Sequence, residues 1–91
     1  MIIEKKCWPV YFEKILSGKK TFEIRLGDFV CEEGDILRLR EYHPIQREYT
    51  GRVLDKEITF IMNTQDVDFW THEEIEEHGL KILALKEKMK Q

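Results

Sequence analysis

The sequence has few of the features that secreted and membrane proteins need. Its two cysteines, Cys7 and Cys31, are too few to staple a small secreted domain, so we expect a reducing, cytoplasmic compartment. No apolar run approaches the ~20 residues that span a bilayer. Lys5 and Lys6 precede an amphipathic stretch rather than a plain apolar one, so we expect neither a secretion signal nor a membrane partner.

Several catalytic and ligand-binding motifs are also missing. His72 and His78 are six residues apart, a spacing that does not place two metal ligands on one helical face. Ser17 has no general base near it in the sequence, and no glycine-rich loop of the phosphate-binding type occurs. We therefore expect no metal and no cofactor.

A strong positive charge is absent as well. The net charge of −3 argues against nonspecific binding to duplex nucleic acid, which requires that many phosphates be neutralised. The charge is uneven, because residues 1–52 carry ten basic and nine acidic side chains whereas residues 53–91 carry five and nine. A small basic patch in the first part fits a few phosphate contacts or a small ligand.

The length and the apolar pattern indicate one α+β domain over residues 1–91. We expect a helix over about 9–17, opened by a proline that suits the first helical turn and carrying one apolar stripe. We expect a second, short helix over about 71–78, because Thr71 and Glu74 have the spacing of a capping box.

The remaining apolar segments predict strands. Alternating or β-branched residues place them over residues 1–7, 21–25, 36–42 and 49–62. Residues 80–85 are either a buried final strand or a continued helix, and their length and the preceding Gly79 favour the strand. In the longest of these, Gly51 indicates a bulge or bend, and Ile58, Phe60 and Met62 read as its core face. About five or six short strands with short connections predict a small, mostly antiparallel barrel with the first helix packed beside it.

The densest set of reactive side chains follows the first helix. Gly18 can take the left-handed conformation that ends a helix. The next residues alternate as in a half-buried strand, so that Thr21, Glu23 and Arg25 would share a polar face at steps of about 7 Å, with Lys20 at the junction. These groups predict a cleft that reads a nucleic-acid base, or, more simply, an ion pair on an outer strand face.

These segments resemble a known family. The pattern is carried by Lys6-Cys7-Trp8-Pro9, by Ile15-Leu16-Ser17-Gly18-Lys19-Lys20-Thr21-Phe22-Glu23-Ile24-Arg25, by Gly34-Asp35-Ile36-Leu37, by Leu39-Arg40-Glu41-Tyr42 and by Tyr49-Thr50-Gly51-Arg52. It resembles the ASCH superfamily with its PUA-like β-barrel, and most of all a small phage and bacterial subgroup of unassigned function. The resemblance implies a cleft between helix and barrel, and binding of RNA or a nucleotide.

One ASCH branch hydrolyses the acetyl amide of N(4)-acetylcytidine with a lysine, a threonine and a glutamate. Lys20 aligns with that lysine, and Glu23 stands where the branch has its threonine. The glutamate falls where this chain has Glu73 and Glu74, without a clear match. If the protein is an enzyme, the resemblance implies an amidohydrolase for an acylated or otherwise modified nucleoside, with Lys20 and Glu23 as its catalytic residues.

We predict a module that binds RNA or a modified nucleotide. Its expected ligand contacts are Lys6, Trp8, Lys20, Thr21, Glu23, Arg25, Arg40 and Tyr42. Basic side chains would contact phosphate, Glu23 would accept from a base amino group, and Trp8 or Tyr42 would stack on a base. As an alternative, Trp8 forms a hydrophobic staple with Phe12, and Tyr42 lies on a solvated face.

A third hypothesis is a phage-type protein-interaction factor that uses the acidic helix or an exposed arginine face. The pair Phe69 and Trp70 lies in a polar loop. It would plug the open end of the barrel, or act as a lid over the ligand.

Overall fold

The computed structural model describes residues 1–88, which divide into two compact units, residues 1–61 and residues 62–88. The first unit contains a sheet and a helix, and the second contains two short helical segments. The single domain expected over residues 1–91 stays a prediction.

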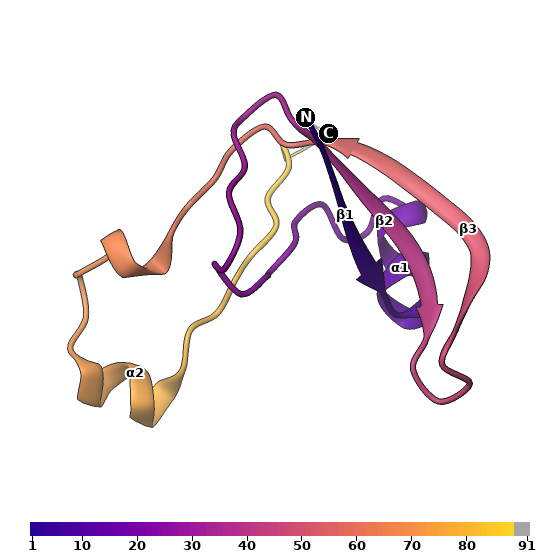
Figure 1. The fold of residues 1–91 in the computed structure, drawn as a ribbon. Coiled ribbons are helices and arrows are strands. Elements are labelled where there is room, and N and C mark those ends of the chain that lie inside the picture. Colours follow the sequence, from indigo (N-terminus) through magenta and orange to yellow (C-terminus); the bar gives the residue numbers. More distant parts are fainter. Residues whose placement is uncertain (89–91) are drawn as a thin grey trace. The chain divides into compact units, whose positions relative to one another are not determined.

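The first unit is a three-stranded mixed sheet with one helix (Figure 1). Strand β1 (Ile2–Cys7) leads into helix α1 (Pro9–Leu16), and the chain then returns to strand β2 (Ile36–His43). β2 pairs parallel with β1 and antiparallel with β3 (Glu48–Glu57), so the strand order is β1-β2-β3. Parallel neighbours need a crossover connection, and α1 with the segment after it supplies this connection.

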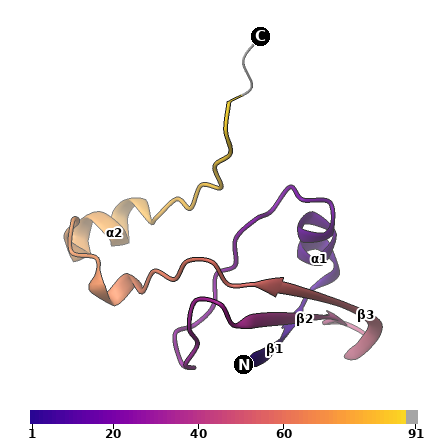
Figure 2. The same cartoon turned by 90° about the horizontal axis from the view of Figure 1, so that it is seen from above.

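The core lies between α1 and one face of the sheet, as the view from above shows (Figure 2). Strand side chains alternate between the two faces, which turns Leu37 and Leu39 of β2 toward Phe12 and Ile15 of α1. Phe12 and Leu39 are each 1% exposed and form the centre of this core. The remaining core contacts come from Cys7 and from the partly buried Ile3, Leu54 and Ile58.

Helix α1 has the predicted limits to within one residue. Pro9 occupies its first turn, and Ser17 is its C-cap. Gly18 has φ +82°, the left-handed conformation that favours glycine, so the predicted helix end is confirmed.

The predicted irregularity in β3 is also confirmed. The register between β2 and β3 shifts between Arg40 and Tyr42, and Gly51 on the opposite strand has φ +95°. This bulge brings Thr50 and Arg52 against the inward-facing Glu41, which no sequence pattern predicted.

Glu41 is 4% exposed, and both of its carboxylate oxygens accept hydrogen bonds. Thr50 Oγ1 donates at 2.6 Å, and Arg52 donates from Nε at 2.9 Å and from Nη2 at 2.8 Å. The hydrogen bonds from Arg52 are the main reason why the pKa of Glu41 falls from 4.5 to about 2. Because Arg52 also pairs with Glu13 of α1, this network ties the sheet to the helix.

The predicted barrel was wrong in strand number and in strand direction. Within residues 1–88 the sheet has three strands, and it is not closed. Residues 21–25 and 80–85 form no ladder, and β3 ends at Glu57, which leaves Phe60 and Met62 70% and 66% exposed. Alternation describes which side chains would share a face, but a strand also needs a neighbouring strand edge to pair with.

The second unit contains a 3-10 turn (Thr64–Asp66) and helix α2 (His72–His78). The predicted capping box is confirmed, since Thr71 Oγ1 accepts from the Glu74 amide at 3.1 Å and Glu74 Oε1 accepts from the Thr71 amide at 2.9 Å. Phe69 and Trp70 meet edge to face at 5.7 Å. Neither described helix is long and apolar enough to cross a membrane.

Candidate functional site

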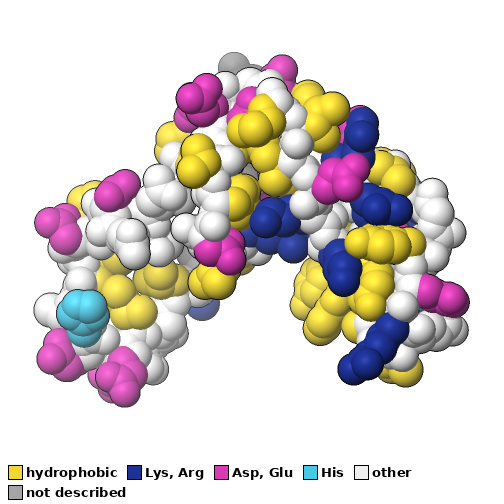
Figure 3. All heavy atoms as spheres, viewed as in Figure 1, with side chains coloured by type: hydrophobic (Ala, Val, Ile, Leu, Met, Phe, Trp, Pro, Cys, Tyr) yellow, Lys and Arg dark blue, Asp and Glu magenta, His cyan; other side chains and the backbone are white. Residues whose placement is uncertain are grey.

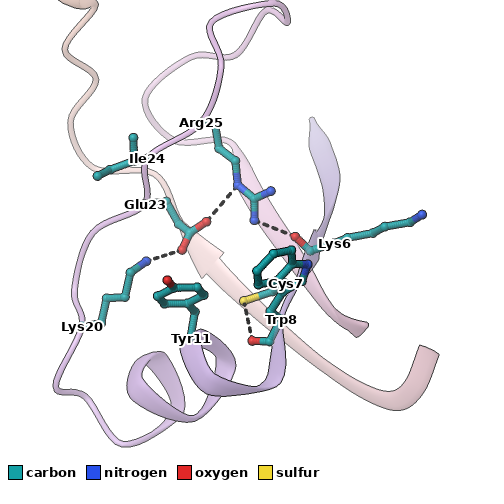
Figure 4. Close-up of a pocket in the computed structure, with 8 residues that line it drawn as sticks. All are labelled: Lys6, Cys7, Trp8, Tyr11, Lys20, Glu23, Ile24 and Arg25. Carbon is teal, nitrogen blue, oxygen red and sulfur yellow. Dashed lines mark hydrogen bonds and ion pairs between the residues drawn. The ribbon is translucent and has the colours of Figure 1, made fainter. Parts of the chain in front are cut away.

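A pocket of about 400 Å³ opens in the first unit beside the start of α1 (Figure 4). Its walls come from the end of β1, from the first turn of α1 and from residues 20–25, which follow the helix. The lining residues are Lys6, Cys7, Trp8, Tyr11, Lys20, Glu23, Ile24 and Arg25. The volume lies within the range of about 300–1,000 Å³ typical of small-molecule sites.

One wall is a chain of ionic contacts centred on Glu23. Lys20 Nζ lies 2.5 Å from Glu23 Oε1, and Arg25 Nε lies 3.0 Å from Glu23 Oε2 (Figure 4). The exposed fractions of the side chains are 15% for Lys20, 18% for Glu23 and 29% for Arg25. These groups are therefore largely withdrawn from bulk water. Ion pairs that are partly buried in this way are less screened than ion pairs on an open surface.

Two further hydrogen bonds anchor this wall to the backbone. Lys20 Nζ donates to the carbonyl of Phe22 at 2.7 Å, and Arg25 Nη2 donates to the carbonyl of Lys6 in β1 at 2.7 Å. Residues 20–25 therefore attach to β1 through side chains rather than through a strand ladder, and this is how the pocket wall is held in place.

The pocket is positively charged although the protein is acidic. Lys20 and Arg25 contribute two positive charges and Glu23 contributes one negative charge, which leaves a surplus of one, while the Lys6 side chain points away from the pocket (Figure 4). The whole chain has a net charge of −3. The surplus favours an anionic group, such as a phosphate, at this place.

The pocket also has an aromatic rim. Trp8 and Tyr11 lie three residues apart, at the spacing that puts two side chains on one side of a helix. Trp8 is 53% exposed and Tyr11 is 47% exposed, so both rings present open apolar surface beside the cationic wall. Such rings stack well on planar ligands.

Cys7 lines the floor of the pocket and is 3% exposed. Burial, and then the negative charge of Glu23, raise the pKa of the Cys7 thiol. Its Sγ lies 3.8 Å from the carbonyl oxygen of Trp8, to which it can donate a weak hydrogen bond. The thiol is thus kept protonated, which suits a packing role and does not suit a nucleophile.

The structure brings five of the predicted ligand contacts into this pocket, namely Lys6, Trp8, Lys20, Glu23 and Arg25. Thr21 is exposed and does not line it, because residues 21–25 are not a strand and do not alternate strictly. Arg40 and Tyr42 lie on the sheet face away from α1, where Lys6 Nζ is 4.2 Å from the Tyr42 ring.

Three lining residues were missed: Cys7, Tyr11 and Ile24. Tyr11 could have been predicted as a lining residue from its helical spacing to Trp8. The sequence held no such signal for Cys7 or Ile24. Among the described residues, no group of three or more His, Cys, Asp or Glu side chains is placed to hold a metal ion.

The fold and the site define a small α+β protein with a basic, aromatic-rimmed pocket. The chain belongs to the family described as Domain of unknown function (DUF3850), whose model matches residues 2–74 and so includes every residue of the pocket.

A curated relative comes from Escherichia phage P2 and is named "Uncharacterized 12.9 kDa protein in GpA 3'region". It is 38% identical over 65 residues, which cover 71% of this chain and 58% of the relative. The chain thus spans 58% of the length of this relative. No solved structure gives a significant match.

Proposed function

We propose that the pocket binds a nucleotide, either free or as part of RNA. The observation that carries this proposal is the surplus of one positive charge, from Lys20 and Arg25 against Glu23, beside two open aromatic rings, within a chain of net charge −3. A nucleotide combines the two matching features, a phosphate and a planar base. Glu23 is the one carboxylate of the wall and would accept from an exocyclic amino group of the base.

The arrangement favours recognition over catalysis. A lysine that acts as a base or a nucleophile needs a free amine, whereas Lys20 donates to both Glu23 and the carbonyl of Phe22. Glu23 in turn accepts from a cation at each of its two oxygens. An amidohydrolase that uses Lys20 and Glu23 is therefore the second candidate, and it is favoured only by the proximity of these two groups.

We also propose that the family is a branch of the ASCH superfamily and that the protein works in the cytoplasm. The motif around Gly18 and the placement of the pocket between the first helix and the sheet support the first statement, and the free cysteines Cys7 and Cys31 support the second.

The test is a titration followed by two-dimensional amide NMR at 50 mM salt. AMP, CMP, GMP and UMP are each compared with the matching nucleoside. We expect shifts at Trp8 and over residues 20–25, and tighter binding of the monophosphates than of the nucleosides. Lys20→Ala should abolish these shifts, whereas Lys19→Ala should leave them, because Lys19 is a neighbouring exposed lysine that does not line the pocket.

Four results would decide against the proposal or redirect it. An absence of shifts with all four monophosphates would contradict it, and so would equal loss in the two lysine variants. Release of acetate from N(4)-acetylcytidine by the wild type and not by Lys20→Ala would favour the hydrolase. Binding of a protein through residues 71–78, with an unresponsive pocket, would favour an interaction factor of the phage type.

A further inference from the structure

A second cluster of cations and aromatic rings lies on the face of the sheet that points away from α1. Lys6 pairs with Arg40 across β1 and β2, and Tyr42 pairs with Tyr49 across β2 and β3. Directly opposed residues share a face, so these four side chains meet. We call this set (Lys6, Arg40, Tyr42 and Tyr49) the sheet cluster.

The contacts within the sheet cluster alternate between cation and ring. Lys6 Nζ lies 4.2 Å from the centre of the Tyr42 ring, and the Arg40 guanidinium carbon lies 3.9 Å from the centre of the Tyr49 ring. The two rings meet edge to face at 5.2 Å. Figure 3 views the protein from this side and shows Lys and Arg side chains interleaved with hydrophobic ones over the strands.

We propose that the sheet cluster holds a nucleotide that flanks the one in the pocket, so that the ligand is a single strand of at least two nucleotides. This inference rests on the proposed function of the pocket. It extends that function because it selects single-stranded RNA over a free nucleotide as the ligand.

The link between the two sites is Lys6. Its backbone carbonyl accepts from Arg25 in the wall of the pocket, and its ammonium group covers Tyr42 in the sheet cluster. One residue of β1 therefore belongs to both surfaces. A strand that leaves the pocket along β1 meets the cluster next.

Along the outer face of β2, the sheet cluster is the place where positive charge is left over for a phosphate. Arg38, further along β2, is held by Asp55 at 2.8 Å and 2.9 Å, so its charge is already matched. Arg40 Nη1 lies 4.0 Å from Glu4 Oε2, a weaker contact than those of Arg38 with Asp55. Lys6 and Arg40 with this single carboxylate leave one positive charge for a phosphate.

The existing cation–ring contacts do not block the cluster. A base stacked on an aromatic ring is worth about 5- to 150-fold in affinity, whereas an exposed cation–π contact is worth about two- to fivefold. Replacing a cation–π contact with a stacked base is therefore favourable. The displaced cation remains beside the phosphate. Tyr49 is 42% exposed, so one ring of the cluster is open to a base.

The test measures dissociation constants for CMP and the single-stranded tetranucleotide rC4, and for the pairs UMP with rU4 and AMP with rA4, at 50 mM salt. We expect each tetranucleotide to bind at least about fivefold tighter than its monomer. Tyr49→Ala should weaken tetranucleotide binding by about 5- to 150-fold and leave monomer binding unchanged. Arg40→Gln should weaken the tetranucleotide and reduce its dependence on salt.

Two control variants keep the result interpretable. Tyr49→Phe retains the ring and should retain tetranucleotide binding even if the alanine variant unfolds. Lys56→Gln removes an exposed cation of β3 opposite the inward-facing Leu37 and should change neither constant.

The outcomes separate the two proposals. If monomers bind in a Lys20-dependent way and tetranucleotides bind no tighter, the sheet cluster is refuted and the pocket stands. If no monomer binds but tetranucleotides bind in a Tyr49-dependent way, the pocket proposal fails and the flanking arrangement fails with it, while the sheet cluster remains as a single-strand binding surface. Equal binding of an eight-base-pair RNA duplex would overturn the single-strand inference.

Discussion

The buried carboxylate of Glu41 allows a stability prediction with a defined dependence on pH. The pKa of Glu41 falls from 4.5 to about 2 in the folded protein, mainly through hydrogen bonds from Arg52. A depression of this size corresponds to roughly 3 kcal/mol in favour of the folded state when the carboxylate is charged. The Arg52 side chain is 45% exposed, so water screens part of the interaction. We expect Glu41→Gln to lower the free energy of unfolding by about 2 kcal/mol at pH 7.

The sign of the pH dependence follows from the direction of the shift. A depressed folded-state pKa contributes stability above the unfolded value of 4.5, and this contribution is lost as the pH falls toward 2. The difference between wild type and Glu41→Gln should therefore shrink to less than about 1 kcal/mol at pH 3. Urea denaturation followed by circular dichroism at pH 7 and pH 3 measures both values.

Asp55 supplies a matched control for this prediction. It accepts two hydrogen bonds from Arg38, at 2.8 Å and 2.9 Å, with nearly the same geometry as Glu41 and Arg52. Its side chain is 45% exposed rather than 5%. Asp55→Asn should therefore lower the free energy of unfolding much less than Glu41→Gln does. An equal cost for the two variants, or a Glu41→Gln effect that is the same at both pH values, would refute the argument that burial makes the difference.

Two further predictions concern the end of α1 and the thiols. Gly18→Ala should lower the free energy of unfolding by about 1 kcal/mol, as measured by urea denaturation, because φ at this position is +82°. No steric clash adds to this strain, since an added Cβ would meet nothing within 4 Å. Gly18→Asn should lower the free energy of unfolding by less. If Gly18→Ala leaves that free energy unchanged, the helix end tolerates the strain and the prediction is wrong. Iodoacetamide at pH 7.5 should alkylate Cys31 before Cys7, since Cys7 is 3% exposed and its thiol pKa is raised. Mass spectrometry of the peptides gives both rates, and equal rates would contradict the burial of Cys7.

The sequence predicted elements whose signals are local. The proline at the start of α1, the glycine after its end and the capping box of α2 each act within a few residues. The alternation over residues 36–42 also predicted strand β2, in which Leu37 and Leu39 face the core. These features needed no knowledge of distant partners, which is why they were predictable.

Features that depend on distant partners were missed or predicted wrongly. The alternation over residues 21–25 predicted a strand, yet Arg25 bonds to the carbonyl of Lys6, and no strand ladder forms there. Alternation in β2 also turns Glu41 inward, but nothing in the sequence indicates that Arg52 would reach it. That contact depends on the bulge at Gly51, which shifts the register of two strands.

The contacts around Glu23 serve the fold and still leave the pocket charged. A purely structural role would need one cation for this carboxylate, and Lys20 at 2.5 Å would be enough. Arg25 is a second cation on the same group. One positive charge is thus held at a partly enclosed place without a matching acid. Solvent or a ligand must balance it, and the open rings of Trp8 and Tyr11 favour a ligand that has a planar group beside its negative charge.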